Sequence, residues 1–139
     1  MADDVLLNKA ATIERCVRRA REEYAAAGPD FATNFSHQDA AILNIQRACE
    51  AALDIAQHLC RAHPRGIPQS ARDAFELLAK GGLIAQPMAD AMKKMVGFRN
   101  IAVHDYQSLL LPITENIITH HLDEFLQFTH MLLAKTTDR

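Results

Sequence analysis

Five residues with chemically active side chains lie close together in segment 97–106: Arg99, Asn100, His104, Asp105 and Tyr106. An arginine guanidinium has a fixed fork of donors that fits a phosphate, and it stays charged at any relevant pH. A histidine imidazole can both take and give a proton near neutral pH. A metal-independent ribonuclease needs these groups: a base for the ribose 2′-hydroxyl, an acid for the leaving oxygen and a cation for the charge on phosphorus. The segment therefore indicates chemistry on a phosphodiester.

Helix geometry limits how these side chains can meet. In a continuous helix Arg99 and Tyr106 share one face, while His104 lies about 140° around the axis from Arg99. Either the helix breaks after Gly97, or the arginine and the histidine are brought together in another way, for instance across a two-fold interface. One histidine in the motif of each chain also fits poorly with separate acid and base roles, whereas a symmetric dimer supplies two. A surface salt-bridge cluster that includes Asp105 is the structural alternative.

The pattern Arg99-Asn100-x3-His104-x-Tyr106 resembles the motif of the HEPN superfamily, in which an arginine and a polar residue precede a histidine by a few positions. The extension to His-x-Tyr looks like the HepT toxins, which are paired with MntA-type minimal nucleotidyltransferase antitoxins. The similarity covers essentially the whole chain. It includes the order of the helices and the stretch 49–55 in addition to the motif.

The resemblance implies a homodimeric, metal-independent endoribonuclease without a cofactor, in which two motifs face each other in one cleft. Arg99 is then expected to bind the phosphate and stabilise the transition state, and His104 to act as the catalytic acid and base. Asn100 is expected to support the active site. Tyr106 matches the tyrosine that the partner enzyme modifies with AMP, which blocks RNA binding and cleavage.

Two other functions are compatible with the same residues. The chain could be a non-catalytic helical partner and substrate of a nucleotidyltransferase, with Tyr106 as the acceptor and with Arg99 and His104 binding nucleotide. It could also be a purely structural helical dimer. Whether the unmodified chain cleaves RNA distinguishes a nuclease from a non-catalytic partner.

Segments with helical periodicity, separated by glycine and proline, make up the rest of the chain. Apolar residues recur every three or four positions, and no segment shows the period-two alternation of a strand. The sequence therefore predicts an all-α, up-and-down bundle of about five helices that forms one domain over residues 1–139. The five segments span residues 3–28, 36–63, 70–81, 87–106 and 112–133.

Local signals mark where some of these helices begin and end. Ser36, followed by Asp39, and Ser70, followed by Asp73, have the spacing of N-terminal capping boxes. Gly28 is the expected stop of the first helix. The end of the fourth helix is left open, because its pattern continues as far as residue 106 without a glycine or proline after position 97.

Composition excludes several classes of protein. The 139 residues carry a formal net charge of −2, which excludes a polycationic nucleic-acid binder but not a local basic patch. The apolar runs are too short to cross a bilayer, and the acidic start is unlike a secretory signal. Three cysteines, an odd count, argue against a disulfide framework and favour buried thiols in a reducing cytoplasm.

Two further clusters are interpreted as structural. His58, Cys60 and His63 lack the second pair of ligands that a tetrahedral metal site needs, so no metal is expected. Met88, Met92 and Met95 recur at helical spacing and are assigned to the core or to a dimer interface rather than to a binding groove. The sequence also has no glycine-rich phosphate-binding loop, and therefore no nucleotide cofactor is expected.

Overall fold

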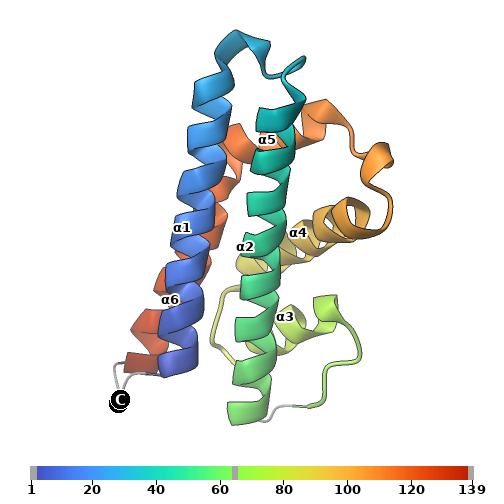
Figure 1. Cartoon of the computed structure of the whole chain (residues 1–139). Helices are drawn as coiled ribbons and strands as arrows, with labels where there is room; N and C mark the ends of the chain where they lie inside the picture. Colours follow the sequence, from blue (N-terminus) through green and yellow to red (C-terminus); the bar gives the residue numbers. More distant parts are fainter. Residues whose placement is uncertain (1–2, 64–65, 138–139) are drawn as a thin grey trace.

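The computed structural model describes residues 3–63 and 66–137, and all its regular elements are helical (Figure 1). The all-α prediction is confirmed for these residues, which contain no strand. The α-helices and the two short 3-10 helices (η) are α1 (Asp4–Ala27), η1 (Gly28–Asp30), α2 (Phe35–Ala62), α3 (Ala71–Lys80), α4 (Gln86–His104), η2 (Tyr106–Ser108), α5 (Leu111–His120) and α6 (Leu122–Thr137).

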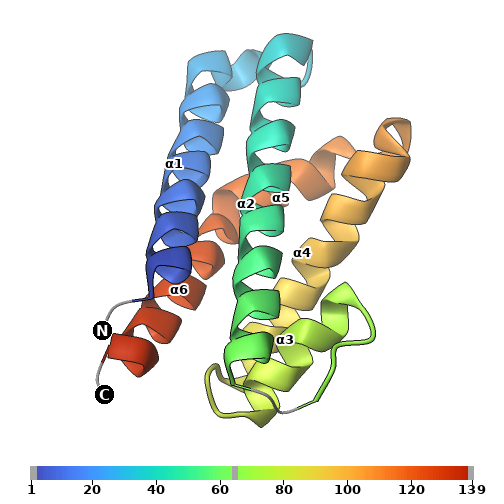
Figure 2. The same cartoon turned by 60° about the horizontal axis from the view of Figure 1, so that its bottom comes forward.

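The helices form an antiparallel bundle around the long hairpin of α1 and α2. These two helices pack along most of their length, and α6 returns along α1 so that the start of α1 and the end of α6 lie close together (Figure 2). On the other side, α4 crosses α2 and packs against α3. The short α5 connects the far end of α4 to α6. The motif segment therefore lies at the free end of α4, next to α2.

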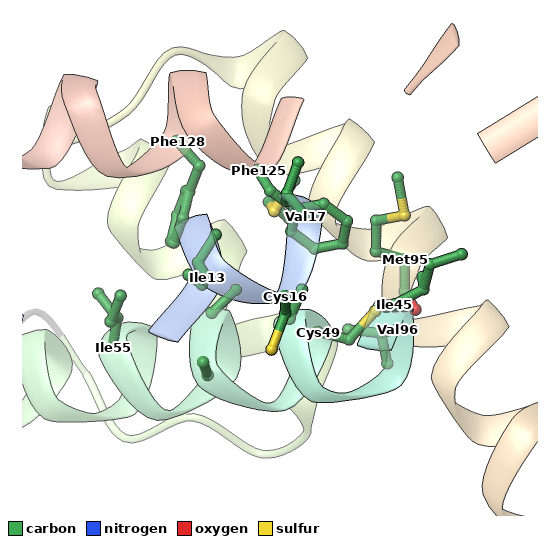
Figure 3. Close-up of a cluster of buried hydrophobic side chains, with 14 of the residues drawn as sticks. Ile13, Cys16, Val17, Ile45, Cys49, Ile55, Met95, Val96, Phe125 and Phe128 are labelled. Carbon is green, nitrogen blue, oxygen red and sulfur yellow. Dashed lines mark hydrogen bonds between the residues drawn. The ribbon is translucent and has the colours of Figure 1, made fainter. Parts of the chain in front are cut away.

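One contiguous core joins the helices, and buried apolar residues from all the α-helices line it. Figure 3 shows side chains from α1, α2, α4 and α6 meeting between the helices. The three cysteines are buried and unpaired, as predicted for small apolar residues in helical stripes. The predicted methionine stripe on α4 is also confirmed as part of the core. Its members are Met88, Met92 and Met95.

The structure confirms the predicted end of α1 and the predicted start of α3, but it corrects the start of α2. Gly28 ends α1 with a φ of 55°, and the Ser70 side chain accepts a hydrogen bond from the Asp73 N–H. The prediction that Ser36 caps α2 is wrong, because Asn34 is the cap and its side chain accepts from the His37 N–H. The Asn34 N–H in turn donates to the Asp30 carbonyl. The preceding turn therefore leads directly into α2, and the helix begins before residue 36.

This correction leads to a stability prediction. Replacing Asn34 with alanine should lower the free energy of unfolding by about 1 kcal/mol, because the helix loses its side-chain cap. The matched change Ser36→Ala should cost less than about 0.5 kcal/mol, as expected for an exposed residue without a special contact. Urea unfolding of the two variants measures both values. Equal destabilisation by the two changes would contradict the assignment of Asn34 as the cap.

The prediction of about five helices is corrected to six α-helices within the described residues. The last predicted helix is broken at His121, whose backbone (φ −125°, ψ −7°) leaves the helical region. The His121 Nδ1 lies 2.6 Å from Glu124 Oε1, in the first turn of α6. The break allows α5 to cross the end of the bundle while α6 packs along α1. No glycine or proline occurs at position 121, so the apolar periodicity predicts one continuous helix across it.

Candidate active site

α4 continues without interruption from Gly97 through Arg99 to His104. The helix spans Gln86–His104, and the Asp105 N–H donates to the Ile101 carbonyl at 2.8 Å to close its last turn. Gly97 lies inside this helix, with the Arg72 guanidinium beside it. Of the two arrangements considered for Arg99 and His104, a break after Gly97 is therefore wrong.

Arg99 and His104 consequently point in different directions from the same helix, about 140° apart. Arg99 is half-buried, and His104 is exposed at the end of α4. Burial raises the pKa of the Cys49 thiol on α2, and the nearby Arg99 guanidinium opposes part of this shift. Arg99 thus lies on the side of α4 that faces α2, and His104 leaves the helix in another direction.

Asn100 is half-buried and four residues before His104. Residues at this spacing are neighbours on one face of a helix. The Asn100 amide therefore lies on the His104 side of α4 rather than on the Arg99 side. A hydrogen-bonding group in this position can orient the imidazole or contact a substrate bound next to it.

Tyr106 follows the end of α4 in the short helix η2 (Tyr106–Ser108) and is turned back toward α2. Its hydroxyl donates a hydrogen bond to Asp39 Oδ1, a residue 67 positions away in the sequence. Ser108 closes the same turn, because its Oγ donates to Asp105 Oδ2 at 2.5 Å. Burial, together with the hydrogen bond and the charge of Asp39, raises the pKa of the Tyr106 phenol. The phenol is therefore protonated at physiological pH.

Asp39 is the residue of this site that sequence reasoning assigned to another role. Its position three residues after Ser36 suggested a capping box, whereas the structure places its carboxylate against Tyr106. No local pattern could have revealed the contact, since it depends on how α4 crosses α2.

The similarity of the chain to known proteins includes the segment that contains these residues. The family model described as ribonuclease HepT-like matches residues 13–132. The mRNA nuclease HepT of Shewanella oneidensis is 51% identical over 133 residues, which cover 96% of this chain and 99% of that protein. The chain belongs to the HepT-like ribonuclease family.

Solved structures agree with this membership of the HepT-like family. A tri-AMPylated Shewanella oneidensis HEPN toxin in complex with an MNT antitoxin has a TM-score of 0.90 and 50% identity, covering 96% of this chain and 99% of that one. A toxin–antitoxin structure with AMP-PNP also has a TM-score of 0.90, with 51% identity, covering 95% and 99% of the two chains. The cytosolic protein YutE from Bacillus subtilis, at 16% identity and a TM-score of 0.73, shares the fold.

In this HepT-like chain an apolar groove lies next to the motif, but the candidate catalytic side chains do not line it. The groove has a volume of about 660 Å³ and lies between α4, α5 and α6, with Phe98 and Ile101 of α4 in its wall. Arg99, His104 and Tyr106 are absent from its lining. Of the candidate groups of the HepT-like fold, His104 and Tyr106 are exposed and Arg99 is half-buried.

Neither a cluster of metal ligands nor a membrane-spanning helix is found in the described part of the chain. No group of three or more possible metal ligands occurs among residues 3–63 and 66–137. His58, considered above for a metal site, instead has its Nε2 2.7 Å from the capping carboxylate of Asp3. No helix in the described ranges is long and apolar enough to span a membrane.

Proposed function

We propose that this chain is the toxin of a toxin–antitoxin pair, a metal-independent endoribonuclease whose site is formed by two copies of the chain. The observation that carries the proposal is its 51% identity, over nearly the whole length of both proteins, to an mRNA nuclease. The Arg99–His104 motif and Tyr106 supply the groups that such a reaction and its control require.

The residues of the motif have distinct roles in this reaction. One His104 takes the proton of the ribose 2′-hydroxyl as it attacks the adjacent phosphorus, and the other His104 gives a proton to the departing 5′ oxygen. The guanidinium of Arg99 binds the phosphate and stabilises the additional negative charge of the transition state. Asn100, on the same helix face as His104, holds the imidazole in position.

A dimer supplies what one chain lacks. Arg99 and His104 diverge from a continuous helix, and a single imidazole cannot serve as acid and base in the same step. Large apolar side chains are also exposed around the end of α4, including Leu110 at 62% and Ile113 at 49%. Exposed apolar patches of this kind mark association surfaces. We therefore place the two-fold interface at this end of α4, with two motifs facing each other.

Control of the nuclease is assigned to Tyr106. The tyrosine accepts AMP from an MntA-like nucleotidyltransferase antitoxin, as the tri-AMPylated state of the related HEPN toxin suggests. Each transferred group adds a negatively charged phosphate and a large nucleoside two residues after His104. These additions repel and obstruct the RNA backbone where Arg99 must bind it. RNA and the antitoxin are thus the partners of the chain, whose residues 1–139 act as one domain in the cytoplasm.

Mixed dimers test the proposed site directly. Wild-type and His104→Ala chains are combined in equal amounts in denaturant, refolded, and assayed for RNA cleavage with a chelator present. If both imidazoles serve one cleft, only wild-type homodimers are active, and the activity should be about one quarter of that of wild type alone at the same total concentration. If each chain instead has an independent site, the activity should be about one half of that of wild type alone.

A matched mixture controls for losses on refolding. Wild type combined with His130→Ala, an exposed histidine on α6, should retain the full activity of refolded wild type. Activity of one half in the His104→Ala mixture, with full activity in the control, would contradict the shared cleft. Absence of cleavage by unmodified, chelator-treated wild type would contradict the nuclease itself.

A further inference from the structure

The contact between Tyr106 and Asp39 joins two distant parts of the chain at the proposed modification site. Asp39 lies in the second turn of α2, whose register is fixed by the Asn34 cap and by the packing of Ala41 and Ile45 in the core. Its carboxylate is on the exposed side of the helix and accepts the hydrogen bond of the Tyr106 hydroxyl. A rigid element thus holds an acceptor at the phenolic oxygen.

The surroundings of the phenol favour a chemical role for this carboxylate. The phenol is protonated, so its oxygen is a poor nucleophile until the proton is removed. Burial is the largest single cause of the raised pKa of the phenol, and the hydrogen bond to Asp39 and the charge of Asp39 raise it further. Tyr106 remains 43% exposed, so a second reactant can approach the oxygen from the solvent side. In kinases, an aspartate in this relation to a substrate hydroxyl accepts its proton during phosphoryl transfer.

We propose that Asp39 is the proton acceptor in the modification of Tyr106, so that the toxin contributes a catalytic group to its own neutralisation. This inference rests on the proposed function. The Tyr106 Oη forms a bond to the α-phosphorus of a nucleoside triphosphate held by the antitoxin. The bond from that phosphorus to the pyrophosphate oxygen breaks, and pyrophosphate leaves with the electron pair. The phenolic proton passes to Asp39 Oδ1 and then to water.

The same contact explains why the acceptor tyrosine is held at a defined place. The hydrogen bond orients the phenol while it is unmodified, and the transferred phosphate removes the donor. A phosphodiester next to the Asp39 carboxylate is also repelled by it. The product therefore leaves the position that the substrate occupied, which favours the forward direction of the transfer.

The test uses Asp39→Asn in the full chain with its nucleotidyltransferase and ATP. Asparagine keeps an oxygen that can accept the Tyr106 hydrogen bond but is not a base. The rate constant for AMP addition, followed by intact mass, should fall about 100-fold, within the range of general-base effects. Asp54→Asn on the same helix, an exposed aspartate paired with Lys9 at 3.0 Å, should leave the rate unchanged.

A pH series separates proton acceptance from positioning. The rate constant of Asp39→Asn for AMP addition should approach that of wild type as the pH rises from about 7 to about 9, because hydroxide increasingly removes the phenolic proton. His104 and Asp105 at the end of α4 are present in both proteins, so the comparison is made as the ratio of the two rate constants at each pH. Melting temperature and antitoxin binding of the variant are compared with wild type to show that fold and docking are retained.

The outcomes are distinct. A large deficit that narrows with pH supports the inference. A wild-type rate for Asp39→Asn, or a deficit that is the same at every pH, overturns it while the proposed function stands. If the wild-type chain itself acquires no AMP at Tyr106, both the inference and the proposed control by modification are overturned.

Discussion

Replacing His104 with alanine should abolish RNA cleavage by the unmodified chain. The change removes both imidazoles from the proposed cleft, and with them the acid and the base of the reaction. General acid–base catalysis contributes about 10²–10⁴-fold to a rate, so we expect a loss of at least about 1,000-fold. The cleavage rate of a labelled RNA by the purified chain, with a chelator present, measures it.

This loss should occur without loss of the fold. His104 is exposed at the end of α4, so the free energy of unfolding should change by less than about 0.5 kcal/mol. His130→Ala is the matched control on α6 and should cleave like wild type. Cleavage by His104→Ala within twofold of wild type would contradict the assigned role, whatever the activity of the control.

Tyr106→Phe should produce a toxin that its antitoxin cannot silence by modification. Phenylalanine keeps the aromatic ring but lacks the oxygen that accepts AMP. With antitoxin and ATP present, the mass of this variant should stay that of the unmodified chain, and its RNA cleavage should continue. The lost hydrogen bond to Asp39 should cost at most about 1 kcal/mol of stability.

Tyr24 provides the control, since the chain has two tyrosines. The Tyr24 hydroxyl lies 3.4 Å from Glu115 Oε2, and its ring packs edge-on against Phe31. Tyr24→Phe should still be modified and silenced. Modification of Tyr106→Phe to the same extent as wild type would place the acceptor elsewhere, and silencing without added mass would indicate inhibition by complex formation.

Local sequence signals were sufficient where local chemistry decides the structure. The apolar spacing of α1 and α2 predicted their buried faces, and Gly28 and Ser70 predicted helix ends that the structure confirms. Each of these depends on residues within one or two turns of the helix concerned. The groups proposed for the chemistry could be selected in the same way, from one contiguous segment of α4 and η2.

Features that depend on distant parts of the chain could not be predicted. The end of α4 lies at a position with no glycine or proline, and the turn after it brings Tyr106 to Asp39 on another helix. The break at His121 likewise belongs to the path of α5 across the bundle rather than to a local signal. Helix continuity was the decisive information, because it directs Arg99 and His104 to different sides of α4 and leads to the proposal of a two-chain site.

The most direct test of the account combines intact mass with RNA cleavage on the same sample. The chain is produced with and without its antitoxin, and each mass species is purified and incubated with RNA and a chelator. We expect the unmodified species to cleave RNA and the species with AMP on Tyr106 to be inactive. An unmodified species that leaves RNA intact, or an AMP-bearing species that cleaves equally well, would contradict the account.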